Sequence, residues 1–411
     1  MPNLSVGLVL ASFATGLMTV AGDPPRREQY ERIVGEFDAA RARAVDASRI
    51  AKTEAVERAI KWPRPTDYYP RLMALADDRT DDDAARMALI WVLSKHVEAG
   101  ANGARVPIAL RAVDALLKDH KDDEAVGLLT LGMVSFASSP RDRFLRALFE
   151  QTSHRPNRGR ACLALAQYLK MKGECAQQMR TPAFRAADPA LDSGFYGAAY
   201  LRTLMEIDPG PLLAESEQLF EKVLAEYADI EYPRHPRRPD QRLTLGDVAT
   251  KDLDELRHLS VGKQAPEING PDVDGREMTL SESRGKVVVL VFWGTWCGSC
   301  MAQVPRERAL AERMKGRPFA LLGVNSDEDR EKLKEAIGRE KIAGRSWFDG
   351  GKVGGPIASR WNVKFWPTVY ILDHRGVIRA REVSDMDFLD TMVETLVSEA
   401  EADVAKPRSI R

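Results

Sequence analysis

The segment Trp296-Cys297-Gly298-Ser299-Cys300 holds two cysteines separated by two residues, and it constrains this chain more than any other segment. The apolar run from Val287 to Phe292 precedes it and predicts a buried strand. The residues after it, Met301 to Lys315, are predicted to form a helix. The sequence therefore places both sulfur atoms between the end of a strand and the start of a helix.

A cysteine pair at a helix N-terminus is suited to disulfide exchange, because the helix dipole stabilises the thiolate that acts as the nucleophile. We interpret Cys297 as the attacking thiol, because it is expected to be the more exposed of the two. Cys300 is then the thiol that resolves the mixed disulfide. Trp296 is expected to limit solvent access, while Gly298 and Ser299 set the loop geometry and the thiol acidity.

Two other interpretations fit a cysteine pair of this spacing. A structural zinc site needs four ligands, whereas the chain has no second Cys-x-x-Cys and its six histidines show no ligand spacing. We therefore expect no metal, and the motif requires no cofactor. A redox-inactive pair inside a scaffold used only for binding is the second interpretation, and it stays open.

The composition bears on the partners and the cellular compartment. The formal net charge of −1 over 411 residues gives no electrostatic basis for binding nucleic acid. Residues 1–22 carry no charged side chain and predict a signal peptide cleaved after Ala21, hence a periplasmic or otherwise extracytoplasmic protein. Because this segment lacks an initial basic residue, an uncleaved membrane anchor and a buried helix are the alternatives.

Residues 26–230 predict an all-α domain. Tyr30, Ile33, Val34 and Phe37 have the spacing of one helix face, and later helices are expected at 160–171, ending near Gly173, and at 216–228. Paired helices with short connections predict a bundle or a solenoid that can bind a protein partner. Residues 214–227 resemble a tetratricopeptide helix, but no repeat period is established.

The proline- and arginine-rich segment that follows predicts a linker over residues 231–258, with one further helix from Asp247 to Leu259. Strands and helices then alternate, which predicts an α/β domain over residues 259–401 with a mixed sheet and helices on both faces. Residues 402–411 are expected to be a tail. The elements expected in this domain are a hairpin turn at Asp274-Gly275, strands at 319–324, 368–372 and 377–383, and helices at 328–340 and 387–399.

Trp366-Pro367-Thr368 is the second informative motif. A proline that begins a strand in a protein with this cysteine pair predicts a cis peptide bond. Together with Gly262–Glu267, Arg284–Val288 and Phe292–Cys300, this motif makes the region from Leu259 to Glu399 resemble the thioredoxin-fold thiol-disulfide oxidoreductases of the TlpA/ResA type.

The resemblance implies a thioredoxin fold in which cis-Pro367 packs against the disulfide and the substrate backbone pairs with the residue before it. It also implies protein thiols or disulfides as substrates and, for reductases of this kind, an electron donor in the membrane. The supporting residues at the site are then Trp296, Gly298, Ser299, Gln303, Trp366 and Thr368.

The chain departs from its relatives at two acidic positions. Val291 stands where thioredoxin has a buried aspartate, and Gln303 stands where proteins of the TlpA/ResA type often have a glutamate. Neither side chain can accept a proton. Proton transfer to Cys300 must therefore use water, the backbone or another group.

Three further features receive structural interpretations. The glycine-rich residues 345–351 predict a variable connection and not a phosphate-binding loop. Ser326 or Asp327 is expected to cap the helix that follows. Cys162 and Cys175 are interpreted as two separate buried thiols, with a structural disulfide between them as the alternative.

These observations predict an extracytoplasmic oxidoreductase, expected to act as a reductase, that exchanges the Cys297–Cys300 dithiol with protein substrates. One alternative is a thiol peroxidase of the peroxiredoxin-related group, although Thr295 lies one position too close to Cys297 for that signature. The other alternative is a non-catalytic protein that binds a partner through its helical domain. The loop Gly298-Ser299 does not determine the redox potential or the direction of electron flow.

Overall fold

A computed structural model of the chain describes residues 24–51, 53, 56, 59–98, 106–132, 139–181, 203–234, 242–383 and 386–405. The predicted signal peptide lies outside these residues. The chain divides into two compact units, the first from residues 1–170, 192–201 and 214–250 and the second from residues 171–191, 202–213 and 251–411. Among the helices of the described part, none is long and apolar enough to cross a bilayer.

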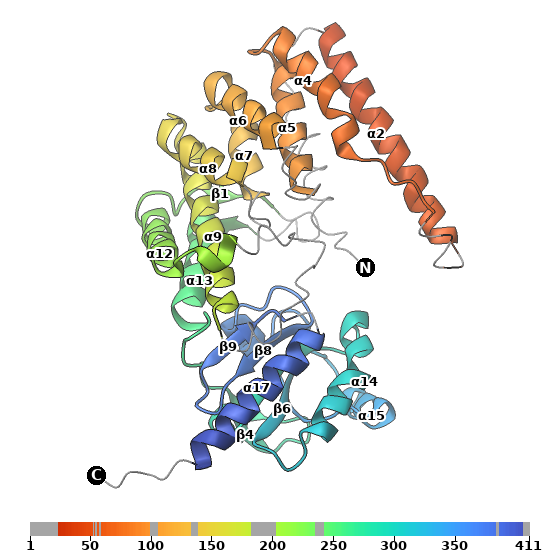
Figure 1. The fold of residues 1–411 in the computed structure, drawn as a ribbon, viewed down its shortest axis with the longest axis vertical. Coiled ribbons are helices and arrows are strands. Elements are labelled where there is room, and N and C mark those ends of the chain that lie inside the picture. The colour runs from red at the N-terminus through yellow and green to blue at the C-terminus, as the bar shows by residue number, and fades with distance from the viewer. Residues whose placement is uncertain are drawn as a thin grey trace. The chain divides into compact units, whose positions relative to one another are not determined.

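The described part of the first unit is built mainly of helices (Figure 1). Helices that are near in the sequence pack on one another, and the predicted inward face of the first helix is confirmed, with Tyr30, Ile33 and Phe37 buried. Phe37 meets Tyr68 and Trp91 edge-on, with ring centroids 5.4 and 5.2 Å away. A repeat period stays a prediction. The helices are α2 (Pro24–Ile50), α4 (Tyr69–Asp78), α5 (Asp83–Glu98), α6 (Val106–Asp119), α7 (Glu124–Leu131) and α8 (Ser139–Gln151), with the short 3-10 helix η1 (Pro65–Asp67).

Two later helices, α9 (Arg155–Met179) and α12 (Pro209–Glu226), contribute residues to both units and are longer than predicted. The expected helix end near Gly173 is wrong. A Cβ atom at this glycine would lie 2.7 Å from the side chain of Leu213 in α12, so Gly173 allows α9 to continue in close contact with that helix. The N-terminus of α12 lies before residue 216 because Asp208 accepts a hydrogen bond from the amide of Gly210 at 3.2 Å.

The predicted linker, residues 231–258, is in large part regular structure. Strand β1 (Glu231–Tyr232) pairs with β2 (Leu243–Thr244), and helix α13 (Leu245–His258) follows directly. Thr244 and Asp247 cap this helix reciprocally, because each side chain accepts a hydrogen bond from the other residue's backbone amide. Residues 235–241, which include two of the three prolines of this segment, lie outside the described residues.

The second unit contains a mixed five-stranded sheet in the order β7 (Arg345–Phe348), β6 (Phe319–Asn325), β5 (Val287–Trp293), β8 (Thr368–Leu372) and β9 (Ile378–Arg381). Strands β5, β6 and β7 are parallel, whereas β8 and β9 are antiparallel to their neighbours. The predicted hairpin turn is confirmed, with β3 (Asn269–Pro271) paired to β4 (Glu277–Thr279). Strand β7 falls in the segment predicted to be a connection, because four residues beside glycines are too few to show a strand period.

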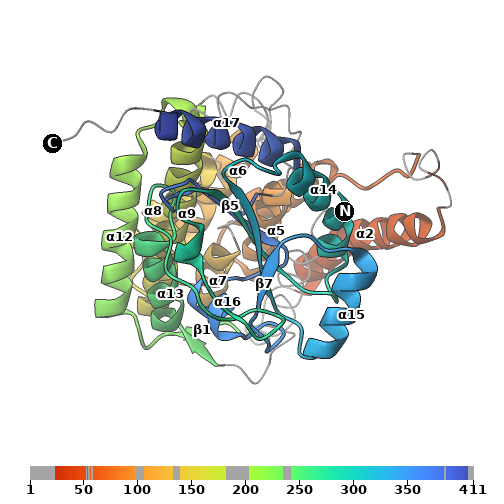
Figure 2. The same ribbon diagram turned by 90° about the horizontal axis from the view of Figure 1, so that it is seen from below.

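The predicted mixed sheet with helices on both faces is confirmed. Alternate residues of β5 pack into two cores, because side chains of a strand point to opposite faces. One core contains α14 (Gly298–Arg313), α15 (Arg330–Glu340) and α17 (Met386–Ala405), and the other contains α16 (Pro356–Arg360) with Trp347 and Trp361. Figure 2 shows α14 and α17 side by side, where Arg313 and Asp390 form an ion pair at 3.0 Å.

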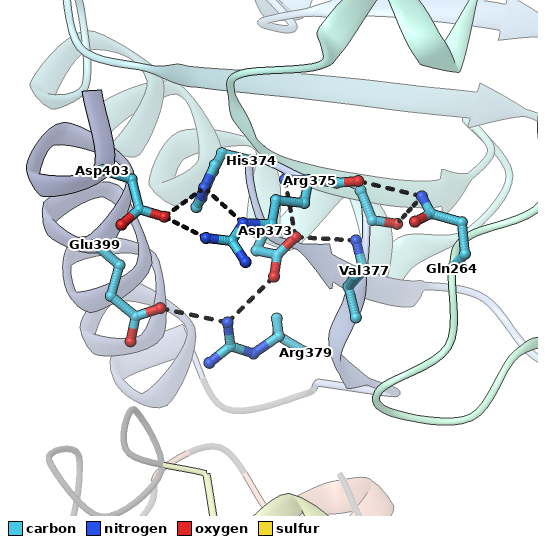
Figure 3. A network of polar contacts seen from close by, with 9 residues as sticks. Gln264, Asp373, His374, Arg375, Val377, Arg379, Glu399 and Asp403 are labelled. Atoms are coloured by element: carbon cyan, nitrogen blue, oxygen red, sulfur yellow. Dashed lines mark hydrogen bonds and ion pairs between the residues drawn. The ribbon is translucent and has the colours of Figure 1, made fainter. Parts of the chain in front are cut away.

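Helix α17 extends to Ala405, past the expected start of the tail at residue 402. Side chains near its C-terminus form ion pairs with the loop that connects β8 and β9 (Figure 3). Asp403 pairs with Arg375 in that loop at 2.5 Å. One turn earlier, Glu399 pairs with Arg379 of β9 at 3.3 Å. This end of β8 is the one opposite to Pro367.

Candidate redox site

The two cysteines of the motif form a disulfide, with their Cα atoms 5.2 Å apart. Strand β5 ends at Trp293 and helix α14 begins at Gly298, so the motif lies at a strand-to-helix junction as predicted. The helix begins before the predicted Met301 because Cys297 itself is the N-cap residue.

The sulfur of Cys297 lies among hydrogen-bond donors. The backbone amide of Cys300 donates to it at 3.1 Å, and the hydroxyl group of Ser299 lies 3.3 Å from it. Both donors belong to the first turn of α14, so they act together with the helix dipole to stabilise negative charge on this sulfur. Cys297 is 6% exposed and Cys300 is 3% exposed, which places Cys297 nearer to the surface.

Aromatic side chains surround the exposed side of the motif. Trp296 is 42% exposed, and its ring centroid lies 5.7 Å from that of Trp366. A Cβ atom at Gly294 would lie 2.6 Å from the indole nitrogen of Trp296, so the ring can lie over the backbone only because this residue is glycine. Phe365 is also exposed. The motif is therefore bordered by apolar surface.

The peptide bond between Trp366 and Pro367 is cis, as predicted. In the sheet, Thr368 lies opposite Phe292 of β5. This register places Pro367 at the end of the sheet where β5 leads into the cysteine motif. The hydroxyl group of Thr368 donates to the carbonyl oxygen of Phe365 at 2.6 Å, which fixes the backbone around the cis bond.

The loop after β6 supports the site in a way that the sequence did not indicate. The predicted cap of α15 is wrong, because Asp329 caps that helix by accepting hydrogen bonds from two backbone amides. Asp327 instead turns toward the cysteine loop and accepts hydrogen bonds from the amide and the hydroxyl group of Thr295, the latter at 2.6 Å. Ser326 accepts a hydrogen bond from the indole of Trp366 at 3.1 Å.

A small cavity of about 20 Å³ is lined by Cys300, Val304 and Glu307 of α14. Burial raises the pKa of Glu307 to about 7 from its ordinary value of 4.5. No motif in the sequence pointed to Glu307, although a spacing of four and seven residues after Cys300 places Val304 and Glu307 on the same helix face. A carboxylate at an apolar position of this pattern was the available indication.

The remaining cysteines are free thiols on one helix, thirteen residues apart. Burial raises the pKa of both Cys162 and Cys175 to about 12, so neither thiolate forms readily near neutral pH. Within the described ranges, no three His, Cys, Asp or Glu side chains are grouped as a metal site. The disulfide exchange chemistry of the described residues is thus centred on Cys297 and Cys300.

Comparison with known proteins assigns this site to a family. Residues 260–396 match the Redoxin family. The thioredoxin-like protein YneN of Bacillus subtilis is 30% identical over 135 residues, which are 31% of this chain and 74% of YneN. The chain belongs to the redoxin family.

Other proteins similar to this redoxin have names that describe disulfide chemistry. The thiol-disulfide oxidoreductase ResA of Bacillus thuringiensis is 28% identical over 120 residues, covering 29% of this chain and 68% of ResA. The solved thioredoxin domain of a thiol-disulfide oxidoreductase from Bacteroides vulgatus is 25% identical, covering 33% of this chain and 98% of that domain with a TM-score of 0.31. This redoxin is a thioredoxin-like thiol-disulfide oxidoreductase, and the resemblance inferred from its motifs is confirmed.

Proposed function

We propose that this redoxin is an extracytoplasmic reductase of protein disulfides, in which Cys297 attacks the substrate and Cys300 resolves the intermediate. One observation carries the proposal. The sulfur of Cys297 accepts a hydrogen bond from the amide of Cys300 and lies beside the Ser299 hydroxyl group, so its thiolate is the better stabilised of the two.

The proposed reaction begins with the reduced dithiol. The Cys297 thiolate attacks one sulfur of a substrate disulfide, forms a mixed disulfide and releases the other substrate sulfur as a thiolate. Cys300 then loses its proton and attacks the Cys297 sulfur, which releases the second substrate thiolate. Two electrons pass from the dithiol to the substrate, and the product is the Cys297–Cys300 disulfide seen in the structure.

The surface beside the disulfide supports a protein substrate. Trp296, Trp366 and Phe365 offer aromatic area to an extended chain. We expect the backbone of Trp366 to pair with that chain beside cis-Pro367. Trp366 is held by its hydrogen bond to Ser326, and we expect this bulky side chain to restrict the substrates that fit. Gly298 and Ser299 shape the loop between the two sulfur atoms, and Thr368 holds the backbone beneath.

An insulin-reduction assay with dithiothreitol tests the proposed activity. We expect turbidity from reduced insulin with the wild-type chain and its loss in Cys297→Ser, because no other described thiol has a stabilised thiolate. The matched control is Cys175→Ser, which is expected to leave the rate unchanged. Activity that survives Cys297→Ser would contradict the assignment.

A trapping experiment tests the partners and the compartment. In Cys300→Ser the mixed disulfide cannot be resolved, so we expect proteins to accumulate in covalent linkage to Cys297. Exported substrates and a membrane electron donor among the trapped proteins would support the proposed location, as would cleavage after Ala21. Trapping of cytoplasmic proteins alone would contradict it. Deletion of the helical domain tests whether that domain captures a partner.

The hydrogen bonds of Thr295 disfavour a thiol peroxidase. Its hydroxyl group donates to Asp327 at 2.6 Å and is therefore not directed at the sulfur of Cys297. We expect no consumption of hydrogen peroxide beyond that of a free thiol.

If partner capture persisted in Cys297→Ser and insulin reduction were absent in the wild type, the chain would be a binding protein without redox activity.

A further inference from the structure

The proposed reaction requires a group that removes the proton of Cys300, and the two positions at which relatives carry a carboxylate hold Val291 and Gln303 here. One carboxylate is nevertheless partly buried on the same helix. Glu307 follows Cys300 by seven residues, or two turns of α14, so both side chains lie on one face of the helix.

Cys300 and Glu307 line the same cavity, whose volume of about 20 Å³ has room for one water molecule. The rest of its wall comes from α14, β5, β6, β7 and the connection before β7, and none of these residues titrates in the physiological range. They are Val291, Trp293, Val304, Leu321, Leu322, Gly323, Ile342, Ala343 and Ser346. Along α14, the neighbours one turn from Glu307 are Gln303, Val304, Leu310 and Ala311, which carry no charge.

Gln303 gives an independent indication of a proton donor or water at this place. Its side-chain oxygen is buried, and no group among the described residues donates a hydrogen bond to it. A buried amide oxygen of this kind is normally satisfied. Gln303 lies one turn from Cys300 and one turn from Glu307, so a water molecule or a protonated Glu307 can reach it.

We propose that Glu307 accepts the proton of the Cys300 thiol during resolution of the mixed disulfide, through a water molecule in the cavity that both residues line. This inference rests on the proposed function. It assigns to Glu307 the proton transfer that Val291 and Gln303 cannot perform.

The Cys300 S–H bond breaks, its proton passes through the water to the Glu307 carboxylate, and the electron pair stays on sulfur. The Cys300 thiolate then attacks the Cys297 sulfur, and the substrate leaves as a thiolate that takes a proton from solvent. Glu307 then returns this proton to solvent. When the disulfide is reduced again, Glu307 takes up a proton from solvent and passes it through the water to the Cys300 thiolate. A group whose pKa is raised to about 7 exchanges this proton readily at neutral pH.

The two half-reactions can be separated by stopped-flow measurement of reduced protein mixed with 5,5′-dithiobis(2-nitrobenzoate). The first thionitrobenzoate released reports attack by Cys297, and the second reports resolution by Cys300. In the wild type we expect the resolution rate to rise with pH through an inflection near 7. In Glu307→Gln we expect this inflection to vanish and resolution at pH 7.5 to slow by roughly tenfold or more, with the first phase unchanged.

Two further variants distinguish proton transfer from a structural effect. Glu307→Asp keeps a carboxylate and is expected to retain the inflection, although at a lower rate. Glu312→Gln removes an exposed carboxylate from the same helix and is expected to match the wild type. If Glu307→Gln shows wild-type kinetics in both phases, or if Glu307→Asp loses the inflection as Glu307→Gln does, the inference is wrong while the proposed exchange stands. If the wild type released no thionitrobenzoate, both this inference and the proposed function would be wrong.

Discussion

The carboxylate of Asp327 lies beside the cysteine loop. It is 7% exposed and accepts hydrogen bonds from Thr295 and from Asn325. Removal of the carboxylate would leave these buried donors without an acceptor. We expect Asp327→Ala to lower the free energy of unfolding by about 2–3 kcal/mol and to slow insulin reduction. Urea denaturation and the turbidity assay measure the two effects. Glu328→Ala, at the exposed neighbouring position, is the control, and equal stability of the two variants would contradict the prediction.

Glu307 also makes stability depend on pH. Its carboxyl group ionises near pH 4.5 in the unfolded chain but near pH 7 in the folded chain, so stability is unaffected below 4.5, falls between 4.5 and 7 and stays lower above 7. We expect the free energy of unfolding of Glu307→Gln, relative to that of the wild type, to be roughly 3 kcal/mol higher at pH 8 than at pH 4. Urea unfolding of the oxidised protein at both pH values measures this difference. If the difference in free energy of unfolding between the variant and the wild type were the same at pH 4 and pH 8, the pKa of Glu307 would not be raised by burial.

At the scale of elements, the start of α9 depends on a residue outside the helix. Asp122, in the connection before α7, accepts hydrogen bonds from the hydroxyl group of Thr152 and from the amides of Ser153 and His154. Burial alone would raise the pKa of Asp122, but these hydrogen bonds outweigh it and lower the pKa to about 2. The stabilisation is therefore present above pH 3.8 and is lost as pH falls toward 2.

We expect Asp122→Ala to lower the free energy of unfolding by about 1 kcal/mol at pH 7, as the loss of a helix cap does. Thermal or urea unfolding measures the change, and the difference from the wild type should disappear at pH 2. Glu150→Ala removes an exposed carboxylate from α8 and serves as the control. A difference that persists unchanged at pH 2 would show that the carboxylate is not the stabilising group.

At the scale of the whole molecule, the second unit joins residues that are far apart in the sequence. Arg381 of β9 is buried beside Glu255 of α13 and lies 3.4 Å from Glu174 of α9, partners that are 126 and 207 positions away. Glu174 also accepts a hydrogen bond from Ser260 at 2.8 Å. These contacts explain why the unit includes helix residues that precede the redoxin match, which begins at residue 260.

We expect Arg381→Met to lower the free energy of unfolding of this unit by about 3–5 kcal/mol, because Glu174 loses this cation and the buried Glu255 keeps Lys364 at 3.5 Å but loses its closer partner. The triple variant Arg381→Met/Glu174→Gln/Glu255→Gln should recover most of that loss. Urea denaturation monitored by tryptophan fluorescence measures both. If the triple variant were no more stable than Arg381→Met, the unpaired charges would not be the cause.

Local patterns in the sequence predicted much of the redoxin domain. The apolar run of β5 and the turn at Gly275 each depend on residues that are close together in the chain, so a short window predicts them. The cis bond at Pro367 was predicted from the proline together with the distant cysteine pair. The helix end expected near Gly173 and the cap expected at Asp327 failed for the opposite reason. Leu213 and Thr295, which decide those positions, are remote in the sequence.

The sequence by itself determined the chemistry of this protein, because two cysteines separated by two residues between a strand and a helix have to lie within disulfide distance. It also determined the resemblance to TlpA/ResA-type proteins. Only the tertiary structure decided what surrounds the two sulfur atoms. Glu307 shares a cavity with Cys300 because β5, β6 and β7 close over one face of α14, and a helix period shows which residues share a face but not which strands cover it.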